Sequence, residues 1–231
     1  MKKLCVLLLT LLALGISAFA IDANIGVIDM RALVSQYKGM TQAQDLFNAK
    51  RTELSAITIA ANGIALPADD FRNYRLLVIK TVPSQTQKDE IAAYEAKAKV
   101  IVNELNAMQV RINEDPDNVS EQEKIDFEAK VQNYIANEKY VRDQIDINSG
   151  RLQKYSQDLD AVIQTQFSDA VKKVAGDKKL NMVLTKSANL TERYEDVVLW
   201  SAPEADITVD VVNYLNSIYT DAMFSKIVVA E

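Results

Sequence analysis

Few of the side chains that carry enzyme chemistry occur in this chain. Its 231 residues include no histidine and one cysteine, Cys5, so metal sites that depend on His or Cys ligands are excluded. General acid–base catalysis would fall to Asp, Glu, Lys or Tyr, and no set of these residues stands apart from ordinary helix surface. Gly39 and Gly176 lie outside the GxxxxGKS/T and GxGxxG patterns that bind nucleotide phosphates. The sequence therefore predicts no enzyme activity, no catalytic or metal-binding residue and no cofactor.

The first twenty residues have the layout of an export signal. Two lysines precede an apolar run, Leu4–Ile16, and the small-x-small triplet Ala18-Phe19-Ala20 follows. We expect a secretory signal peptide cleaved after Ala20. The alternative, a membrane anchor, is disfavoured because the uncharged stretch is short for a spanning helix of about 20 residues. Cleavage removes Cys5 and both lysines, which leaves 24 basic and 32 acidic residues and no thiol for a disulfide. No later apolar run approaches 18 residues, so stable membrane insertion is not expected.

The mature chain changes from a strand pattern to a helix pattern near its start. Asn24–Met30 is a short apolar run typical of a strand. From Leu33, apolar residues recur at alternating spacings of four and three, the seam of a coiled-coil helix. Ile57–Pro83 interrupts this pattern, because it holds two prolines and a glycine close together. Within it, Asp69–Lys80 predicts a short helix with acidic residues in its first turn.

Two long helices with matching seams are predicted after Pro83. A turn at residues 114–118 contains Pro116 and ends the first helix, and Ser120-Glu121-Gln122-Glu123 has the capping-box spacing that starts the second, which runs to Ala175. Two such helices joined by a short turn form an antiparallel hairpin. All seven seam positions of the first helix are apolar: Ile91, Tyr94, Ala98, Ile101, Leu105, Met108 and Ile112. Nine of the eleven seam positions of the second helix are apolar: Phe127, Val131, Tyr134, Val141, Ile145, Leu152, Tyr155, Leu159 and Val162, with Glu138 and Asn148 as the polar exceptions.

The lengths of the helical legs place a joint at Gly150. The outgoing stretches 30–56 and 84–113 total 57 residues and the returning stretch 120–175 has 56, so the legs match if the insert 57–83 is looped out. Ser84 then lies opposite Ser149, beside Gly150. We predict a flexible joint at this level. The alternative, a tolerated glycine in an exposed helix at a cost of about 1 kcal/mol, stays open.

The chain after Gly176 has mixed character. Leu180–Thr185 and Asp196–Trp200 are typical of strands, and the polar connector between them includes Ser187–Glu195. A final helix is predicted over Ile207–Tyr219, capped by Asp206 or Thr208. Its buried face would consist of Val211, Val212, Leu215 and Ile218.

The expected fold class is α+β and mostly α. A long antiparallel helical hairpin, or coiled-coil arm, would occupy residues 31–175, with the insert at 57–83 and a tip at 114–119. Three short strands from both ends of the chain would close a small β body at 21–30 and 176–231, together with the C-terminal helix.

Both ends of this layout resemble the Skp (OmpH-like) family of periplasmic chaperones. Asn24–Leu33 is similar to the opening strand and first helical turn of that family, and Ala170–Ala175 with Leu180–Leu184 is similar to part of its closing segment. The most specific match is Asp206–Asn216, which carries the pattern DIT-x-x-V-x-x-x-LN. The resemblance implies a homotrimer with a central β body and three helical arms around a cavity for unfolded outer-membrane proteins.

The function implied by this resemblance is that of an ATP-independent periplasmic holdase. It would bind unfolded outer-membrane proteins in the cavity between its arms and prevent their aggregation. The expected partners are these clients and further copies of the chain, without nucleic acid. The alternative is an exported coiled-coil structural or spacer protein without chaperone activity, which would not slow the aggregation of a denatured β-barrel.

Two features depart from the family pattern. Residues 113–128 hold seven acidic residues against one basic residue, Lys124, and this charge should repel anionic lipid headgroups and lipopolysaccharide. The alternative is a solvated helix end, where acidic residues near the N-terminus are favourable. The second departure is the insert at 57–83, which makes the chain longer than the family pattern.

The site candidates follow from the needs of a holdase, which binds through many weak, adaptable apolar contacts. Those in the seam have packing within the hairpin as their alternative role. The client-facing candidates are aromatic and Met residues of the two long helices: Tyr94, Met108, Tyr134, Tyr140 and Tyr155. The oligomeric β body is assigned to apolar residues of the two strands: Ile25, Val27, Ile28, Met182, Val183 and Leu184.

Overall fold

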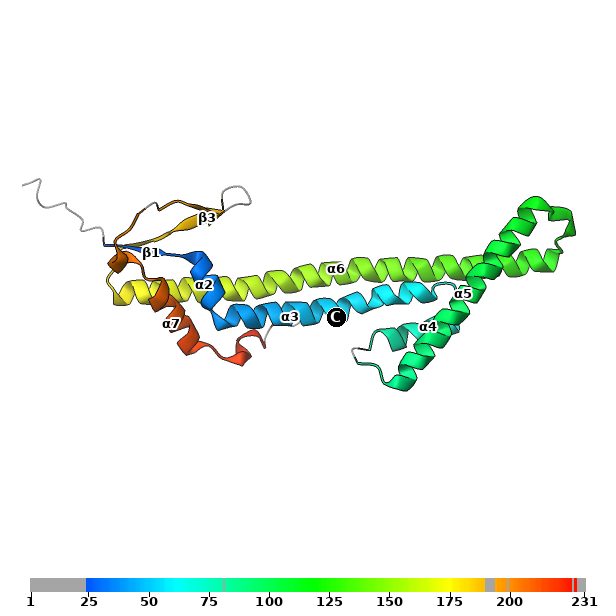
Figure 1. The fold of residues 1–231 in the computed structure, drawn as a ribbon, viewed down its shortest axis with the longest axis horizontal. Coiled ribbons are helices and arrows are strands. Elements are labelled where there is room, and N and C mark those ends of the chain that lie inside the picture. The colour runs from blue at the N-terminus through cyan, green and yellow to red at the C-terminus, as the bar shows by residue number, and fades with distance from the viewer. Residues whose placement is uncertain (1–23, 81, 190–193, 199, 226, 228–231) are drawn as a thin grey trace, which may run out of the picture. The chain divides into compact units, whose positions relative to one another are not determined.

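The computed structural model describes residues 24–80, 82–189, 194–198, 200–225 and 227. The predicted signal peptide and its cleavage site after Ala20 lie outside these residues. The described chain is mostly helical, with long helices and short strands (Figure 1). It divides into two compact units. Unit 1 draws on residues up to Thr41 and on Val162–Asp221, and unit 2 draws on Gln42–Ala161 and the residues after Asp221.

A parallel pair of strands from opposite ends of the chain forms one sheet of unit 1. β1 (Ile25–Ile28) and β2 (Met182–Thr185) pair along their whole length, from Ile25 opposite Met182 to Ile28 opposite Thr185. Val27 and Ile28 are buried, which explains the apolar run in β1. The two strands predicted at these positions are confirmed.

The third strand, predicted at Asp196–Trp200, is wrong in position and does not join the first two strands in one sheet, and Leu199 lies outside the described residues. β4 covers Tyr194–Asp196 and pairs antiparallel with β3 (Ser187–Asn189), which lies inside the stretch expected to be a polar connector. The N–H groups of Val197 and Val198 both donate to the Lys186 carbonyl, so the backbone after β4 returns to the start of β3. The described strands therefore form two sheets of two strands each, and not one sheet of three.

The C-terminal helix of unit 1 is fixed by the side chains at its start. α7 (Thr208–Ile218) begins after Asp206, whose carboxylate accepts a hydrogen bond from the Thr208 N–H at 2.9 Å. Thr208 Oγ1 in turn accepts one from the Asp29 N–H at 2.8 Å, and Asp29 caps α2 (Met30–Gln36) with its own carboxylate. The predicted helix is confirmed. Its N-cap position is Ile207, which makes no side-chain cap hydrogen bond, so the expectation that Asp206 or Thr208 is the N-cap is wrong. Ile218 is 39% exposed, so the last position of the predicted buried face is wrong.

The first helical leg is broken at Tyr37, where an uninterrupted helix was expected. Tyr37 has extended backbone angles and separates α2 from α3 (Lys38–Ser55). The side-chain amide of Asn216 on α7 satisfies both sides of the break, because it donates to the Gln36 carbonyl at 3.1 Å and accepts from the Lys38 N–H at 3.0 Å. One amide thus replaces helical hydrogen bonds lost at the break.

The ring of Tyr37 supplies the apolar contacts that favour this break. It is 1% exposed and lies edge-to-face with Phe167 and Tyr219, at centroid distances of 5.7 and 6.3 Å. Its hydroxyl donates to Gln166 at 2.6 Å. Burial, with a smaller contribution from Tyr219, raises the pKa of Tyr37 to about 12. A large buried aromatic with a satisfied hydroxyl outweighs the loss of one helical turn.

The insert at 57–83 is folded and packs against the helices of unit 2. η2 (Ala56–Gly63) is a run of 3₁₀ helix, and α4 (Ala68–Val78) follows Pro67 with two acidic residues in its first turn. The short helix predicted at Asp69–Lys80 is confirmed and ends two residues earlier. Nine buried residues form the insert core: Ile57, Ala60, Ala65, Leu66, Phe71, Tyr74, Val78, Ala98 and Val141.

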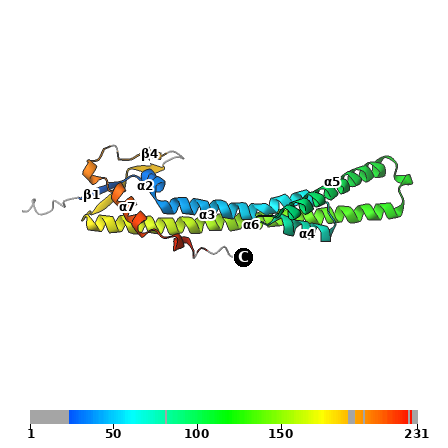
Figure 2. The same ribbon diagram turned by 60° about the horizontal axis from the view of Figure 1, so that its bottom comes forward.

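The two long helices of the sequence prediction are present with both of their caps. α5 (Gln85–Glu114) starts at Ser84 with a capping box to Gln87. α6 (Glu121–Asp177) starts after Ser120, which exchanges hydrogen bonds with Glu123 at 2.9 and 3.3 Å. The turn between the helices contains η3 (Pro116–Asn118). Figure 1 and Figure 2 both show α5 and α6 meeting at this turn.

α6 continues past both of its glycines. It runs without a break through Gly150 and ends at Asp177, two residues later than expected. Lys179 takes a positive φ of 55° there, and the Leu180 N–H donates to the Ala175 carbonyl at 2.9 Å, as in a Schellman C-cap. Gly176 therefore does not terminate the helix.

Candidate functional site

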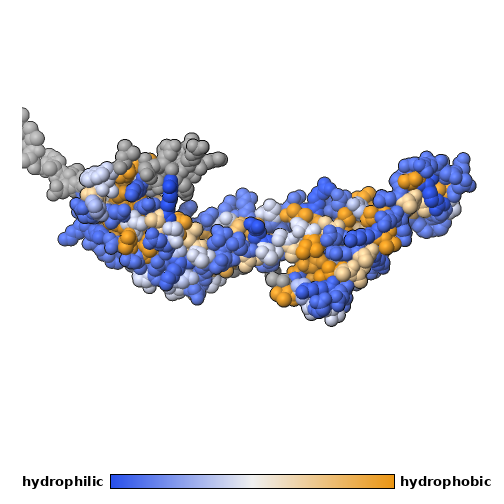
Figure 3. Space-filling view, viewed as in Figure 1, coloured by the Kyte–Doolittle hydropathy of each residue, from blue (hydrophilic) through white to orange (hydrophobic). Residues whose placement is uncertain are grey.

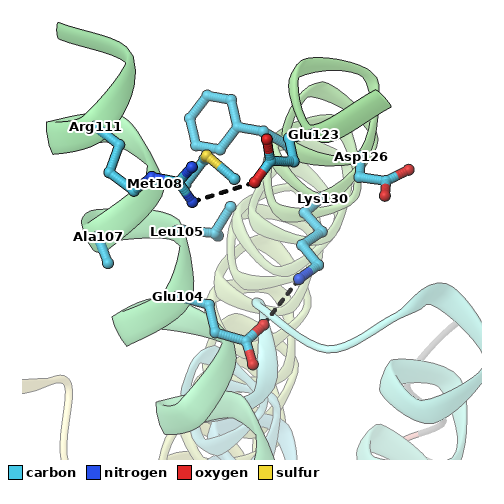
Figure 4. A pocket seen from close by; sticks show the side chains of 9 residues that line it. Glu104, Leu105, Ala107, Met108, Arg111, Glu123, Asp126 and Lys130 are labelled. Atoms are coloured by element: carbon cyan, nitrogen blue, oxygen red, sulfur yellow. Dashed lines mark hydrogen bonds and ion pairs between the residues drawn. The ribbon is translucent and has the colours of Figure 1, made fainter. Parts of the chain in front are cut away.

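An open groove of about 360 Å³ lies between α5 and α6 near their turn (Figure 4). Its apolar lining comes from Leu105 and Met108 on α5 and from Phe127 on α6, all of them half-buried. These three residues occupy seam positions of the two helices, so the same periodicity that pairs the helices also supplies the apolar lining. The remaining lining residues are Glu104, Ala107, Arg111, Glu123, Asp126 and Lys130.

Two ion pairs connect α5 and α6 at this groove. Arg111 Nη1 lies 3.2 Å from Glu123 Oε1, and Lys130 Nζ lies 2.8 Å from Glu104 Oε2 (Figure 4). All four side chains are partly exposed, so each pair adds no more than about 1 kcal/mol. The charges that these ion pairs bring to the groove are therefore already paired, and the apolar lining lies beside them.

Glu123 is both a helix cap and part of the groove. Its carboxylate accepts from the Ser120 N–H and from the Ser120 hydroxyl, each at 2.9 Å. These hydrogen bonds, and then the Arg111 guanidinium, hold the pKa of Glu123 below its usual value. The groove therefore has an ionised carboxylate on its α6 side at neutral pH.

The groove lies in an acidic region. Residues 104–130, all described, include eight acidic and three basic side chains. Each of the three cations is paired with a carboxylate: Arg111 with Glu123, Lys124 with Glu121 and Lys130 with Glu104. The remaining five carboxylates leave a negative excess around the apolar lining: Glu114, Asp115, Asp117, Asp126 and Glu128.

A second, smaller groove of about 190 Å³ lies where α3 gives way to the insert. Its apolar residues are Leu54, Ile57, Ile145 and Leu152. Asn148 closes one side, because its side-chain amide donates to the Leu54 carbonyl at 2.9 Å. Gly150 lies two residues further along α6, and a Cβ built on it would meet no atom within 4 Å. Nothing in the packing thus requires glycine at this position.

Of the five client-facing candidates, Met108 lies in the groove near the turn of α5 and α6, which we call the tip groove. Three of the tyrosines pack against the insert. Tyr94 and Tyr134 are partly buried beside the insert core, and the Tyr94 ring lies edge-to-face with Tyr74 at 6.0 Å. Tyr140 lies edge-to-face with Phe71 at 6.1 Å, and the Arg75 guanidinium sits 4.3 Å from its ring centroid.

Tyr155, the fifth candidate, is the most buried of the set. It is 8% exposed, and this burial raises the pKa of its hydroxyl, although the nearby Lys50 opposes the change. The seam spacing sets only Tyr140 apart and does not separate the other four residues, whereas their packing partners do.

The six residues assigned to the β body divide into a buried and an exposed set. Val27 and Ile28 are each 4% exposed, and Val183 is half-buried. Ile25, Met182 and Leu184 are 37%, 53% and 40% exposed. Since Ile25 lies opposite Met182 in the sheet register, the exposed residues come from both strands of the pair.

Sequence reasoning missed two residues that shape these surfaces. Phe127 was placed in the seam but was not selected as a contact residue, although it lines the same groove as Met108. Asn137 is 7% exposed, and its amide donates to the Ile64 and Leu66 carbonyls of the insert, both at 2.9 Å. The pattern that could have shown its role is a short polar residue three positions after Tyr134 on an otherwise apolar face.

The described residues contain neither a metal-binding cluster of side chains nor a membrane-spanning helix. Within them, no group of three or more His, Cys, Asp or Glu side chains is arranged to hold a metal ion. None of the helices among the same residues has the length and apolar character needed to cross a membrane.

Comparison with known proteins identifies a family for most of the helical region. The model of the family described as outer membrane protein (OmpH-like) matches residues 79–215, which is more than half of the chain. The match begins at the end of the insert and includes α5, α6 and most of α7. Comparison with curated proteins and with solved structures gives no match.

Proposed function

The chain belongs to the OmpH-like family, and on that premise we propose that it is an ATP-independent periplasmic holdase. It binds unfolded outer-membrane proteins and prevents their aggregation. The observation that carries the proposal is the family match over residues 79–215. The aromatic and Met side chains picked out from the sequence as client contacts lie within this matched region, which supports the assignment.

Client binding uses many weak contacts along α5 and α6. An unfolded client has no fixed shape, so its affinity is the sum of small apolar contacts and not the product of one enclosed pocket. Met108 is the strongest of the five sequence candidates, because its flexible thioether lines an open groove. Other large apolar side chains of unit 2 are at least one-third exposed and extend this contact surface: Val100, Val102, Val110, Ile125, Ile135, Ile145 and Ile147.

The working form of the protein is a homotrimer built on its β body. Residues 31–175 of each chain form an antiparallel hairpin arm, and three arms surround the client. The support is the exposed apolar set Ile25, Met182 and Leu184, since apolar side chains gathered on a small sheet are favoured at subunit interfaces. The predicted export signal places the trimer in the periplasm.

The test of chaperone activity is suppression of aggregation. A urea-denatured outer-membrane β-barrel is diluted into buffer with and without the exported protein, and light scattering is followed in the absence of nucleotide. We expect scattering to fall to near baseline at one trimer per client and to be unchanged by added ATP. If scattering is unaffected at this ratio, the spacer alternative from the sequence applies instead.

The test of assembly is the mass in solution. We expect a trimer by multi-angle light scattering, and we expect the double change Met182→Asp and Leu184→Asp to give monomers, because two charges would be buried at the interface. Val209→Asp on α7 is the matched control, since Val209 is 64% exposed and lies outside the assigned strands. A monomeric parent protein would remove the cavity on which client binding depends.

A further inference from the structure

The groove near the turn of α5 and α6 combines an apolar lining with an acidic surrounding. Leu105, Met108 and Phe127 line it, and no residue of 104–130 is buried except Val119. The apolar lining is therefore accessible to solvent over its whole length. An apolar surface left open beside paired charges is a surface suited to a partner.

The size of the groove limits what it can hold. Its volume of about 360 Å³ is at the lower end of the range for small-ligand sites, roughly 300–1,000 Å³. Because the lining is open along two helices, it suits a side chain that projects from an extended chain better than an enclosed small molecule. Met108 can adapt to side chains of different shape, since thioethers are flexible and polarisable.

The charges around the groove limit the partner further. Arg111 and Lys130 are already paired with Glu123 and Glu104, so they do not attract an incoming anion. Asp126 lines the groove and, with the other unpaired carboxylates of residues 114–128, favours a cationic segment.

We propose that this groove binds one bulky apolar side chain of an unstructured polypeptide whose neighbouring residues are lysine or arginine. The proposal rests on the chaperone function proposed above and names the class of client segment that the tip selects. The apolar side chain packs on Met108 and Phe127, and the flanking cations lie near the acidic residues of the turn and of the start of α6.

The location of binding is tested by photo-crosslinking on the full exported protein. The probe is a peptide with a central benzoylphenylalanine between two lysines on each side, and the crosslinked residues are mapped by mass spectrometry. We expect crosslinks in 104–111 and 123–130. Met108→Ala should lower the yield about tenfold, equivalent to about 1.4 kcal/mol, whereas Asn106→Ala, an exposed change on the same helix outside the groove lining, should leave it unchanged. Equal yields for the two variants would overturn the proposal.

The charge preference is tested by a second peptide and a pair of charge variants. The second peptide has glutamate in place of each lysine, and it should crosslink at least fivefold less at low salt. Neutralising Glu114, Asp117 and Glu128 to their amides should remove most of this preference. The matched control neutralises three exposed carboxylates far along the chain, Glu90, Asp146 and Asp160, and should retain it. Retention in both triple variants, or no preference in the parent protein, would overturn the proposal.

Failure of the groove proposal in the crosslinking experiments can be distinguished from failure of the holdase proposal in the aggregation experiment. If the protein suppresses aggregation but the peptide crosslinks elsewhere, the tip groove is not a client site and the chaperone function stands. If the peptide crosslinks in the groove but aggregation is not suppressed, the groove binds basic apolar segments and the holdase proposal fails.

Discussion

The pair of helices α5 and α6 is packed in two different ways along its length. Beside the insert, Ala98 and Val141 are 2% and 4% exposed and belong to a core shared with η2 and α4. Near the turn, Met108 and Phe127 occupy equivalent seam positions and remain half-buried in an open groove. The difference is a third layer: the insert covers the helices at one level, and no described segment of unit 2 covers them at the other.

The surfaces of the two regions differ accordingly. In Figure 3, apolar residues gather over the region of α4 and α5, whereas the turn end of the helices is mainly hydrophilic. The insert covers part of the seam of α5 and α6 and forms a core with it. The tyrosines that lie there therefore contribute to folding stability. The tip keeps its seam residues available to a partner. We therefore expect changes at the insert to alter folding and changes at the tip to alter binding.

The largest expected effect is loss of the insert core in Tyr74→Ala. Tyr74 is fully buried and donates to the Ile59 carbonyl or to Glu95, at 3.1 and 2.9 Å. Its ring also packs against Gly63, where a Cβ would overlap it. We expect a loss of about 3–5 kcal/mol in the free energy of unfolding of unit 2, measured by urea denaturation.

Leu76→Ala is the matched control for this change. Leu76 lies two residues further along α4 and is 53% exposed, so its truncation should cost no more than about 1 kcal/mol. If the two variants are equally stable, the insert is not a core and the contrast with the tip is lost.

The next effect concerns the polar contact that holds the insert on α6. Asn137→Ala would leave the Ile64 and Leu66 carbonyls without the amide that now donates to both. Two unsatisfied acceptors in a buried site should cost about 1–3 kcal/mol. Asn133→Ala, one turn earlier on the same helix, is the control. Hydrogen exchange should speed up in η2 and α4 of the Asn137 variant and should stay unchanged in residues 104–130.

The regular parts of this fold could be predicted from sequence because their determinants are local. The predicted capping box at Ser120 depends on residues within a few positions of each other. The seam spacing likewise includes Leu105, Met108 and Phe127, which line the groove between α5 and α6. At the far end of α6 the predicted seam is displaced by one residue, since Ile163 is buried and the predicted Val162 is not. The reason is that a straight helix drifts away from a strict seven-residue repeat.

The features of the fold that were not predicted from the sequence depend on contacts between residues that are distant in sequence. The break at Tyr37 is stabilised by Asn216, 179 residues further along the chain, and the insert is anchored by Asn137 on α6. A single sequence does not say which polar side chain will reach which backbone group. The candidate site shows the same limit: Met108 and Tyr94 have the same type of seam position, and only the location of the insert assigns one to a groove and the other to a core.

A smaller effect is expected at the tip itself. Ser120→Ala removes the N-cap of α6 and should destabilise its first turns by about 1 kcal/mol, with hydrogen exchange faster at residues 121–125 and unchanged in the insert. The cap also weakens in acid. Because the folded-state pKa of Glu123 is lowered, its contribution is present above the unfolded pKa of about 4.5 and is lost as the pH falls through the folded value.

Loss of the cap in acid can be measured by carboxyl NMR of Glu123. Its titration midpoint should return toward the ordinary glutamate value in Ser120→Ala, because the hydroxyl that contacts the carboxylate is removed. An unchanged midpoint would mean that the cap does not hold this carboxylate, and the tip would then resemble any frayed helix end.

The smallest effect, and the only one of opposite sign, is expected for Gly150→Ala. α6 is continuous at this position and an added Cβ meets no atom within 4 Å, so the alanine should raise the free energy of unfolding by up to about 1 kcal/mol. Ser149→Ala is the control for a change at the neighbouring exposed position. Stability alone does not separate the two roles considered for this glycine, because both predict a more stable variant. Aggregation suppression does separate them: if Gly150 is a joint that lets the arm adapt to its client, the stabilised variant should protect a β-barrel less well than Ser149→Ala. If the two variants protect equally, Gly150 is a tolerated glycine.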